Sequence, residues 1–308
     1  MHLEHIVRTI SPYCEAIILL GGYGRGEGTP FIREEGTQTP FNDYDLVAIV
    51  QTVNPLIRLH FNTLAGQLSE DLGFPVDLTP YQKSRLPSCE FSLLNFEMKY
   101  GHVVLHGPDN ILDAMPDYAC DAIPLHEGSR LLLNRGKLLL DIRQRIAKSD
   151  PLNNEEQLRF KKFILKAWLA FGDAALLAAG QYDIAYAVKK TRIHDIGSCP
   201  ERSVVIAEYL KAVELKEWGD FQALEPYDIQ MELNRVGAVF LRFLPWYRKQ
   251  YSTRECSMSK AIALNLRWNK TFSIRHPREQ LYDIIIELVQ DEYQGSAQRF
   301  FELRKRFA

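Results

Sequence analysis

The sequence lacks long hydrophobic runs and has almost no excess of one charge. The apolar run Ala16–Leu20 is too short for a signal-peptide core or a membrane span. There are 37 Lys and Arg residues against 39 Asp and Glu, which gives a formal charge of −2. A near-neutral chain has no general attraction for nucleic acid or for an anionic membrane. We therefore expect a cytoplasmic protein that binds no membrane and has no general affinity for nucleic acid.

Cysteine and histidine are also sparse and scattered. The five cysteines are odd in number, far apart and never in a CxxC pair, which argues against a disulfide framework and against a zinc knuckle. This usage fits a reducing compartment. The eight histidines form no recognisable metal-ligand set.

The remaining composition is that of a globular protein large enough for two domains. Of the 308 residues, 46% are hydrophobic and 25% are charged, which supplies enough apolar material for a real core. Local patterns in the first third predict a mixture of strands, helices and a long loop. The strands are predicted over Glu15–Leu20, Asp43–Val50, Phe74–Pro80 and His102–Leu105, the helices over 3–12, Leu56–Leu72 and Pro87–Tyr100, and the loop over Thr29–Asn42.

Long helical patterns dominate the chain from about Ile123 onward. The segment 106–124 contains Gly107 and three prolines, and we place the boundary there, with domains over 1–115 and 116–308. The predicted fold is an α/β (α+β) domain with a short mixed sheet, followed by an α-helical bundle domain. The helices are predicted over Leu131–Ala147, Glu155–Ala179, 201–216, 228–243, 257–265 and 277–290, with a basic amphipathic tail over Gln298–Phe307.

The residues that indicate chemistry are three aspartates that follow a glycine-rich turn. The segments read LLGGYGRGEG (19–28), DYDL (43–46) and VDL (76–78). Side chains alternate along a strand, so Asp43 and Asp45 point to the same side. Two adjacent carboxylates repel each other unless a cation neutralises them, and Mg²⁺ binds through one or two carboxylates plus substrate phosphates. Asp77 could complete such a site or take the proton from an attacking hydroxyl.

The glycine-rich turn has the properties of a phosphate-binding segment. Gly21 and Gly22 permit unusual backbone angles and present bare N–H groups, and Arg25 can clamp a phosphate or a leaving group. The turn lacks the GKS or GKT of a Walker loop. It also lacks the single distal acid of a dinucleotide-binding fingerprint, so the glycine pattern alone is weak.

Together these segments resemble the DNA polymerase β-type nucleotidyltransferase superfamily. GGYGRGE followed by DYDL is similar to the catalytic domain of bacterial PII-protein uridylyltransferase, and the resemblance covers residues 15 to about 107. It implies that Asp43 and Asp45 bind metal ions, two Mg²⁺ with Mn²⁺ as the alternative, which hold a nucleoside triphosphate such as ATP. It also implies that Asp77 helps to activate the acceptor hydroxyl, that Gly21, Gly22 and Arg25 hold the nucleotide, and that pyrophosphate leaves.

The sequence also departs from that family. The gap between Glu27 and Asp43 is longer than in the compact family turn, so 29–42 is an insertion. The PII-modifying enzyme continues into phosphohydrolase and regulatory domains, whereas the HD dipeptide of this sequence, His194-Asp195, lacks the surrounding metal histidines, so we do not expect the PII protein as its substrate. The helical remainder is similar in architecture to small-molecule nucleotidyltransferases. The expected reaction is therefore Mg²⁺-dependent transfer of a nucleoside monophosphate to a hydroxyl on a small molecule or a protein. Neutral charge counts against RNA as the acceptor.

Several alternatives stay open at this point. Lys162, Lys166 and Asp173 share one predicted helix face, and Lys166 is a candidate nucleotide contact, although a solvated charged face explains the same pattern. The alternative for the whole chain is an antitoxin-like or catalytically inert nucleotide-binding module with a helical partner-binding domain. Retention of all three acids argues against inertness. A homodimer is compatible with the sequence.

Overall fold

The computed structural model divides the chain into two compact units. It describes residues 2–28, 30–32, 38–40, 43–148, 150–218, 228–251, 257–268, 272–290, 300 and 304. Unit 1 contains Met1–Pro124 together with Tyr182–Thr191 and Val213–Asp220. Unit 2 contains Leu125–Gln181, Arg192–Ala212 and Phe221–Ala308.

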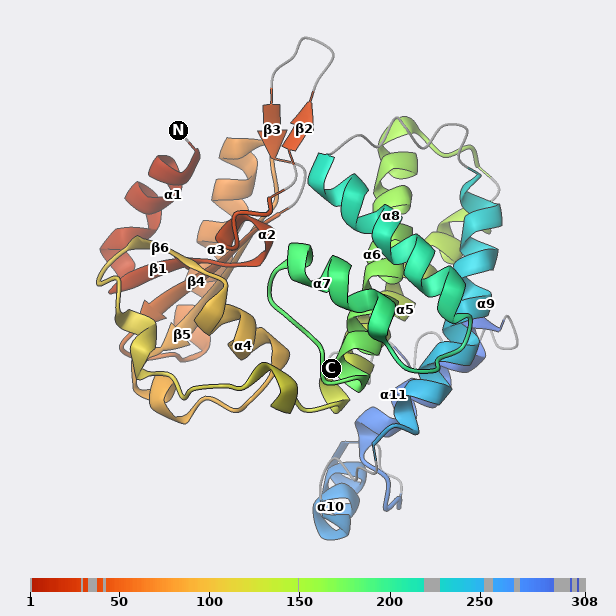
Figure 1. The fold of residues 1–308 in the computed structure, drawn as a ribbon. Coiled ribbons are helices and arrows are strands. Elements are labelled where there is room, and N and C mark those ends of the chain that lie inside the picture. Colours follow the sequence, from red (N-terminus) through yellow and green to blue (C-terminus); the bar gives the residue numbers. More distant parts are fainter. Residues whose placement is uncertain are drawn as a thin grey trace. The chain divides into compact units, whose positions relative to one another are not determined.

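Unit 1 contains a four-stranded mixed sheet with the order β5-β4-β1-β6 (Figure 1). Its strands are β1 (Ala16–Leu19), β4 (Tyr44–Val50), β5 (Val76–Gln82) and β6 (Val103–His106). β1 pairs antiparallel with both β4 and β6, whereas β4 and β5 are parallel and are connected through the helix α3 (Pro55–Leu72). Such a parallel pair needs a crossover, and a helix is the usual one.

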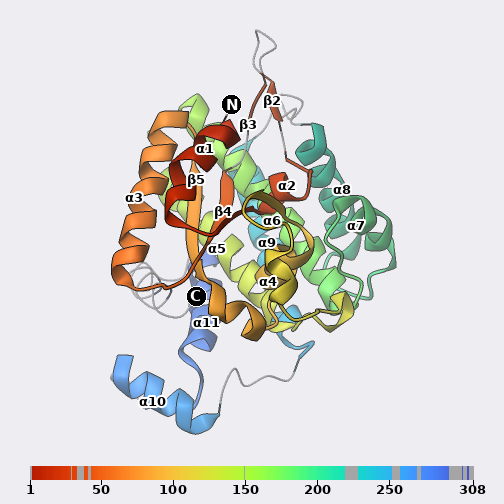
Figure 2. The same cartoon turned by 90° about the vertical axis from the view of Figure 1, so that its left-hand side faces the viewer.

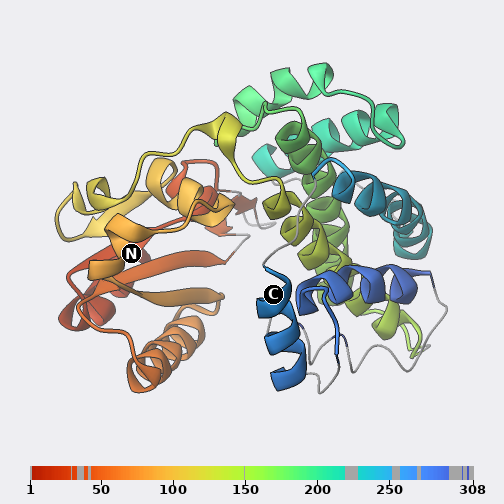
Figure 3. The ribbon, with the colours of Figure 1, turned by 90° about the horizontal axis from the view of Figure 1, so that it is seen from below.

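Alternation along the strands sends one set of side chains into a core under α1 (His2–Ile10) and α3. Figure 2 shows these two helices beside each other, and Figure 3 shows α3 on one side of the sheet and α4 (Leu93–Tyr100) on the other. The core residues on β4 and β5 are Tyr44, Leu46, Ala48, Val50, Val76 and Leu78. Asp45 and Asp77 alternate with them and therefore belong to the opposite face of the sheet.

Local sequence explains where α3 begins and ends. The Asn54 side chain accepts a hydrogen bond from the Ile57 N–H at 2.9 Å, which caps the first turn, and Pro55 occupies the first helical position. The helix ends at Gly73, which adopts the left-handed conformation at φ 62°.

Unit 2 is built around long helices that pack on one another. α5 (His126–Ile146), α6 (Asn154–Ala178) and α9 (Ile229–Arg248) contact each other, and α11 (Pro277–Val289) packs on α5 and α9. Asn153 and Glu156 form a reciprocal capping box at the start of α6. α8 (Arg202–Trp218) and α10 (Met258–Trp268) complete the described helices of the second half of the chain, apart from the short α7 (Tyr186–Arg192).

The predicted combination of a small mixed sheet and a helical region is confirmed, but three local expectations are not. The loop expected over Thr29–Asn42 contains an antiparallel ribbon of β2 (Pro30–Ile32) and β3 (Gln38–Pro40). The helix expected from Pro87 begins at Leu93, because a 3-10 helix occupies Lys83–Ser88 and Ser92 supplies the helix N-cap. α7 was not expected. The predicted tail over Gln298–Phe307 lies outside the described residues, except for Phe300 and Arg304.

Gly66 inside α3 and Gly73 at its C-cap are a matched pair of positions for testing where the helix ends. A Cβ would meet no atom within 4 Å at Gly66 or at Gly73, but only Gly73 has a positive φ. We expect Gly73→Ala to lower the free energy of unfolding by about 1 kcal/mol, because an L-residue is strained in this region. Gly66→Ala should raise it by about 0.5–1 kcal/mol, because Ala is the better helix former. Urea unfolding measures the change in the free energy of unfolding for each variant. Changes of the same sign in the two variants would contradict a helix end at Gly73.

Candidate active site

The structure brings the carboxylates of Asp43, Asp45 and Asp77 together. One ligand oxygen from each residue lies within 4.8 Å of the other two. Asp43 and Asp45 are half-buried, and Asp77 is exposed. Three carboxylates this close repel one another, and a bound cation is the ordinary way to offset that repulsion.

Strand pairing is the reason that these distant residues meet. Asp45 lies opposite Asp77 in the parallel pairing of β4 and β5, so both carboxylates project from the same face at the same edge. Asp43 precedes Asp45 by two positions at the start of β4. β1 is antiparallel to β4, so its end also lies at this edge, where the Leu20 N–H donates to the Asp45 carbonyl at 2.8 Å.

The glycine turn begins directly after this contact, as the short helix α2 (Gly21–Gly24). Gly21 has φ 64°, and a Cβ on it would collide with a carboxylate oxygen of Asp45. The missing side chain is therefore what allows the backbone of the turn to lie against the acid cluster. A Cβ on Gly22 would lie 3.2 Å from the Glu27 carbonyl oxygen.

Arg25 is held by two glutamates. Its Nε donates to Glu27 at 3.1 Å, and its Nη1 donates to Glu97 of α4 at 3.2 Å. The side chain is only 10% exposed. Burial alone would lower the pKa of the Arg25 guanidinium, but Glu97, Tyr186 and Glu27 outweigh it and raise the pKa above its ordinary value. The contact between Arg25 and a nucleotide phosphate stays a prediction, and any phosphate would have to share Arg25 with these carboxylates.

Lys166 belongs to unit 2, where it is half-buried on α6. Its contact with a nucleotide stays a prediction. Asp173 on the same helix is buried and accepts a hydrogen bond from the Tyr209 hydroxyl at 3.0 Å, so its position is explained by packing inside unit 2.

Sequence reasoning missed the partners of the glycine turn outside the first third of the chain. The Tyr186 N–H donates to the Glu27 carboxylate at 2.7 Å, and the Lys216 ammonium donates to the Glu27 carbonyl at 2.7 Å. These pairs are 159 and 189 positions apart in the sequence. No local pattern around Tyr186 or Lys216 marks them, because contacts at such separations follow from the fold alone.

The donor set of the acid cluster suits a hard divalent cation. All three groups offer carboxylate oxygen, which Mg²⁺ and Mn²⁺ prefer, and the cluster contains no thiolate or imidazole that would favour a softer ion. Asp43, Asp45 and Asp77 would hold the ion. Gly21 packs directly against Asp45, so the backbone of the glycine turn borders the acid cluster.

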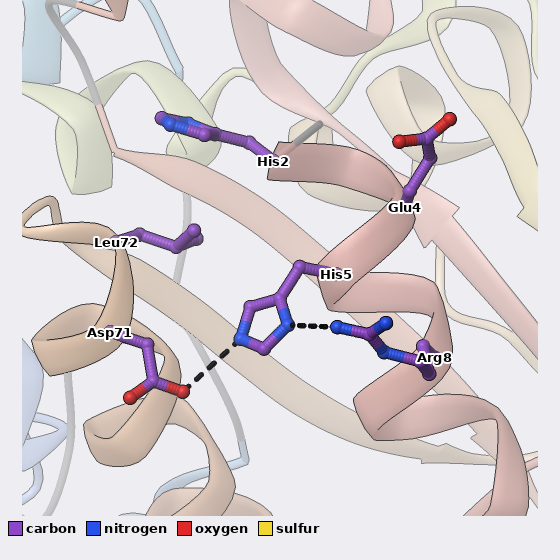
Figure 4. Close-up of a pocket in the computed structure, with 6 residues that line it drawn as sticks. All are labelled: His2, Glu4, His5, Arg8, Asp71 and Leu72. Atoms are coloured by element: carbon purple, nitrogen blue, oxygen red, sulfur yellow. Dashed lines mark hydrogen bonds and ion pairs between the residues drawn. The ribbon is translucent and has the colours of Figure 1, made fainter.

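A second polar site in unit 1 is a pocket of about 570 Å³ beside the start of α1 and the end of α3 (Figure 4). His5 Nε2 lies 3.1 Å from the Asp71 carboxylate, and Arg8 donates to His5 Nδ1 at 3.2 Å. His2, Glu4 and Leu72 complete its lining. Both imidazole nitrogens of His5 already have protein partners, which explains the orientation of the ring without a ligand.

No family model matches the chain, and no curated protein matches it. One solved structure with some likeness to it is a mutant of the toxin–antitoxin pair MntA–HpeT, with 20% identity and a TM-score of 0.26. That alignment covers 37% of this chain and 79% of the other. A TM-score this low does not show that the two chains share a fold.

Among the described helices, none combines the length and the apolar character that a membrane crossing requires.

Divalent ions should stabilise the protein through the acid cluster. We expect MgCl₂ or MnCl₂ to raise the free energy of unfolding, by about 2.7 kcal/mol at an ion concentration of 100 times Kd, because the ion binds only the folded chain. Asp45→Asn should abolish this gain. Asp71→Asn, which changes an exposed carboxylate of the second pocket, should retain it. Thermal unfolding with and without ions measures this stabilisation in the two variants. If only Asp71→Asn loses the stabilisation, the ion binds in the pocket beside α1 and not at the acid cluster.

The close approach of Gly21 to Asp45 can be tested separately from backbone strain. Gly21 and Gly26 both have positive φ, at 64° and 72°, but a Cβ on Gly26 meets nothing within 4 Å. Both Gly→Ala variants should lose about 1–2 kcal/mol of stability from the strained backbone. Only Gly21→Ala should also weaken Mn²⁺ binding, by about tenfold, because its Cβ displaces the Asp45 carboxylate. Calorimetric titration with Mn²⁺ decides this, and equal affinities in the two variants would contradict it.

Proposed function

We propose that the protein is a divalent-cation-dependent nucleotidyltransferase that moves a nucleoside monophosphate from a nucleoside triphosphate to a hydroxyl acceptor. One observation carries the proposal: Asp45 and Asp77 on two parallel strands, and Asp43 directly before the first of them, bring their carboxylates together at the edge where the glycine turn leaves β1. Carboxylates that hold Mg²⁺ beside an unobstructed stretch of backbone form a suitable place for a triphosphate. The resemblance of GGYGRGE and DYDL to the polymerase β-type superfamily supports the same reaction.

In the proposed reaction, the acceptor oxygen forms a bond to the α-phosphorus while the bond to the pyrophosphate oxygen breaks. The acceptor gives up its proton, and Asp77 is the group proposed to receive it. Asp77 is exposed, whereas Asp43 and Asp45 are half-buried, which suits the acid that meets an incoming acceptor. Asp77 is also one of the proposed metal ligands, so the same carboxylate would bind a cation and accept the proton.

Asp43 and Asp45 would hold the cations, and a bound divalent ion would supply neutralisation of the triphosphate charge. The N–H groups of the turn around Gly21 and Gly22 would orient the phosphates. Several of its N–H groups are engaged within the turn, since the N–H groups of Gly24, Arg25 and Glu27 donate to the carbonyls of Leu20, Gly21 and Gly22. Catalysis of this kind depends mainly on positioning and on charge stabilisation.

A small molecule or a protein is the proposed class of acceptor. The chain's net charge of −2 offers no general attraction for RNA. An inert nucleotide-binding module would share the fold but would not need the carboxylate pair and the distal acid at one edge.

The proposal is tested by following nucleoside triphosphate turnover with Mg²⁺ and a panel of hydroxyl acceptors. We expect Asp45→Asn to lower kcat by at least about 10³-fold, because the charge that binds the cation is lost. Asp77→Asn should lower kcat by about 10²- to 10⁴-fold while nucleotide binding persists, because the proton acceptor is lost. Asp109→Asn, a change of an exposed loop acid, should keep wild-type turnover. Unchanged turnover in Asp45→Asn would refute the assignment, and nucleotide binding without turnover would support the inert module.

A further inference from the structure

Two segments from the second half of the sequence fold into unit 1. They are 182–191, which contains most of α7, and 213–220, which contains the end of α8. Both touch the glycine turn or its direct neighbours. The proposed phosphate-binding turn is thus contacted by two segments that are distant from it in the sequence.

Lys216 contacts the backbone of the turn. Its ammonium donates to the backbone carbonyl of Glu27 at 2.7 Å, and Glu27 closes the turn through its N–H to the Gly22 carbonyl, also at 2.7 Å. A Cβ on Gly22 would lie 3.3 Å from the same ammonium. The absence of a side chain at Gly22 therefore leaves room for Lys216 to pack on the turn, as well as for the Glu27 carbonyl.

The Glu27 carboxylate is fixed from the other segment. It accepts from the Tyr186 N–H at 2.7 Å and from Arg25 at 3.1 Å. Arg25 also binds Glu97, whose second carboxylate oxygen accepts from the Tyr182 hydroxyl at 2.8 Å. Hydrogen bonds to ionised groups are stronger than those between neutral groups, so this network holds the end of the turn firmly.

The Tyr186 ring lies among three cations. Lys189 Nζ is 3.9 Å from the ring centroid, Lys216 Nζ is 4.8 Å from it, and the Arg25 guanidinium carbon is 5.9 Å from it. Lys189 is almost fully buried, at 1% exposure, and its ammonium also faces the Tyr182 ring at 4.7 Å. Cation–π attraction increases when the cation is desolvated. The aromatic ring thus helps to keep the Lys216 ammonium at the glycine turn.

We propose that Lys216 is a positioning residue for nucleotide binding: its ammonium holds the Gly21–Glu27 turn in the conformation that lies against the acid cluster. The proposal rests on the proposed function for the nature of the ligand. Its structural part does not, because the contact between Lys216 and the turn exists without a nucleotide. Displacement of the turn would reach the cluster directly, since Gly21 abuts Asp45.

Hydrogen exchange of the nucleotide-free full chain tests the structural part. We expect Lys216→Met to speed exchange in a peptide covering 20–28 by at least about fivefold, because the turn opens more often when its tether is lost. Lys216→Arg, which keeps a charged donor, should restore slow exchange. Lys211→Met, an exposed lysine on the same helix, should leave exchange unchanged. Wild-type exchange of this peptide in Lys216→Met would overturn the proposal, whatever the protein binds.

Calorimetric titration with ATP, CTP, GTP or UTP in the presence of Mg²⁺ tests the consequence for binding. We expect Lys216→Met to raise Kd about tenfold for the nucleotide that binds wild type best, which corresponds to about 1.4 kcal/mol. Lys211→Met should match wild type, and Lys216→Arg should recover most of the affinity. Faster exchange with unchanged Kd would overturn the positioning role. If wild type binds none of the four nucleotides, the proposed function fails, and the exchange experiment still decides whether Lys216 holds the turn.

Discussion

β1 runs antiparallel to β4, and β4 runs parallel to β5, and this pairing pattern gathers the whole candidate site at one edge of the sheet. The antiparallel pair brings the end of β1, and with it Gly21, to the start of β4. The parallel pair brings the start of β5 to the same place, with Asp77 directly opposite Asp45. A shift of one residue in either register would turn a carboxylate towards the hydrophobic core. Burial of the hydrophobic residues that alternate with the acids therefore keeps the strands in the register that brings the carboxylates together.

The glycine turn has charged groups at both of its ends, the acid cluster at Gly21 and a second set of charged residues at Glu27. At Gly21 the turn lies against carboxylates whose mutual repulsion a cation can offset. At Glu27 the carboxylate accepts from Arg25 and from the Tyr186 N–H, and the backbone carbonyl accepts from the Lys216 ammonium. Buried charges are tolerated when they are paired and hydrogen-bonded, and Arg25 between Glu27 and Glu97 meets that condition. The first group could hold a divalent cation, whereas the second is linked to the end of the turn by hydrogen bonds and ion pairs.

Arg25 illustrates how a residue's type and its environment can indicate different roles. An arginine in a glycine-rich turn suits a phosphate, and nothing near it in the sequence other than Glu27 suggests another partner. The fold adds Glu97, which is 72 positions away, and the ring of Tyr186.

The β2–β3 ribbon was not predicted, because two prolines and a glycine in this segment indicate a loop. Three-residue strands can still pair when one lies opposite the other.

Most of the strands and helices, and the three candidate acids, could be predicted from local sequence. Alternation placed Asp43 and Asp45 on one side of a strand, Gly73 ended α3, and the periodic apolar residues of α5 and α6 predicted helices. These features depend on residues that are close in the sequence, so the local pattern is enough to predict them. The tertiary structure was needed to show that Asp77 lies opposite Asp45, that Lys216 and Tyr186 reach Glu27, and that His5 reaches Asp71. Those contacts depend on strand register and packing, which no short stretch of sequence encodes.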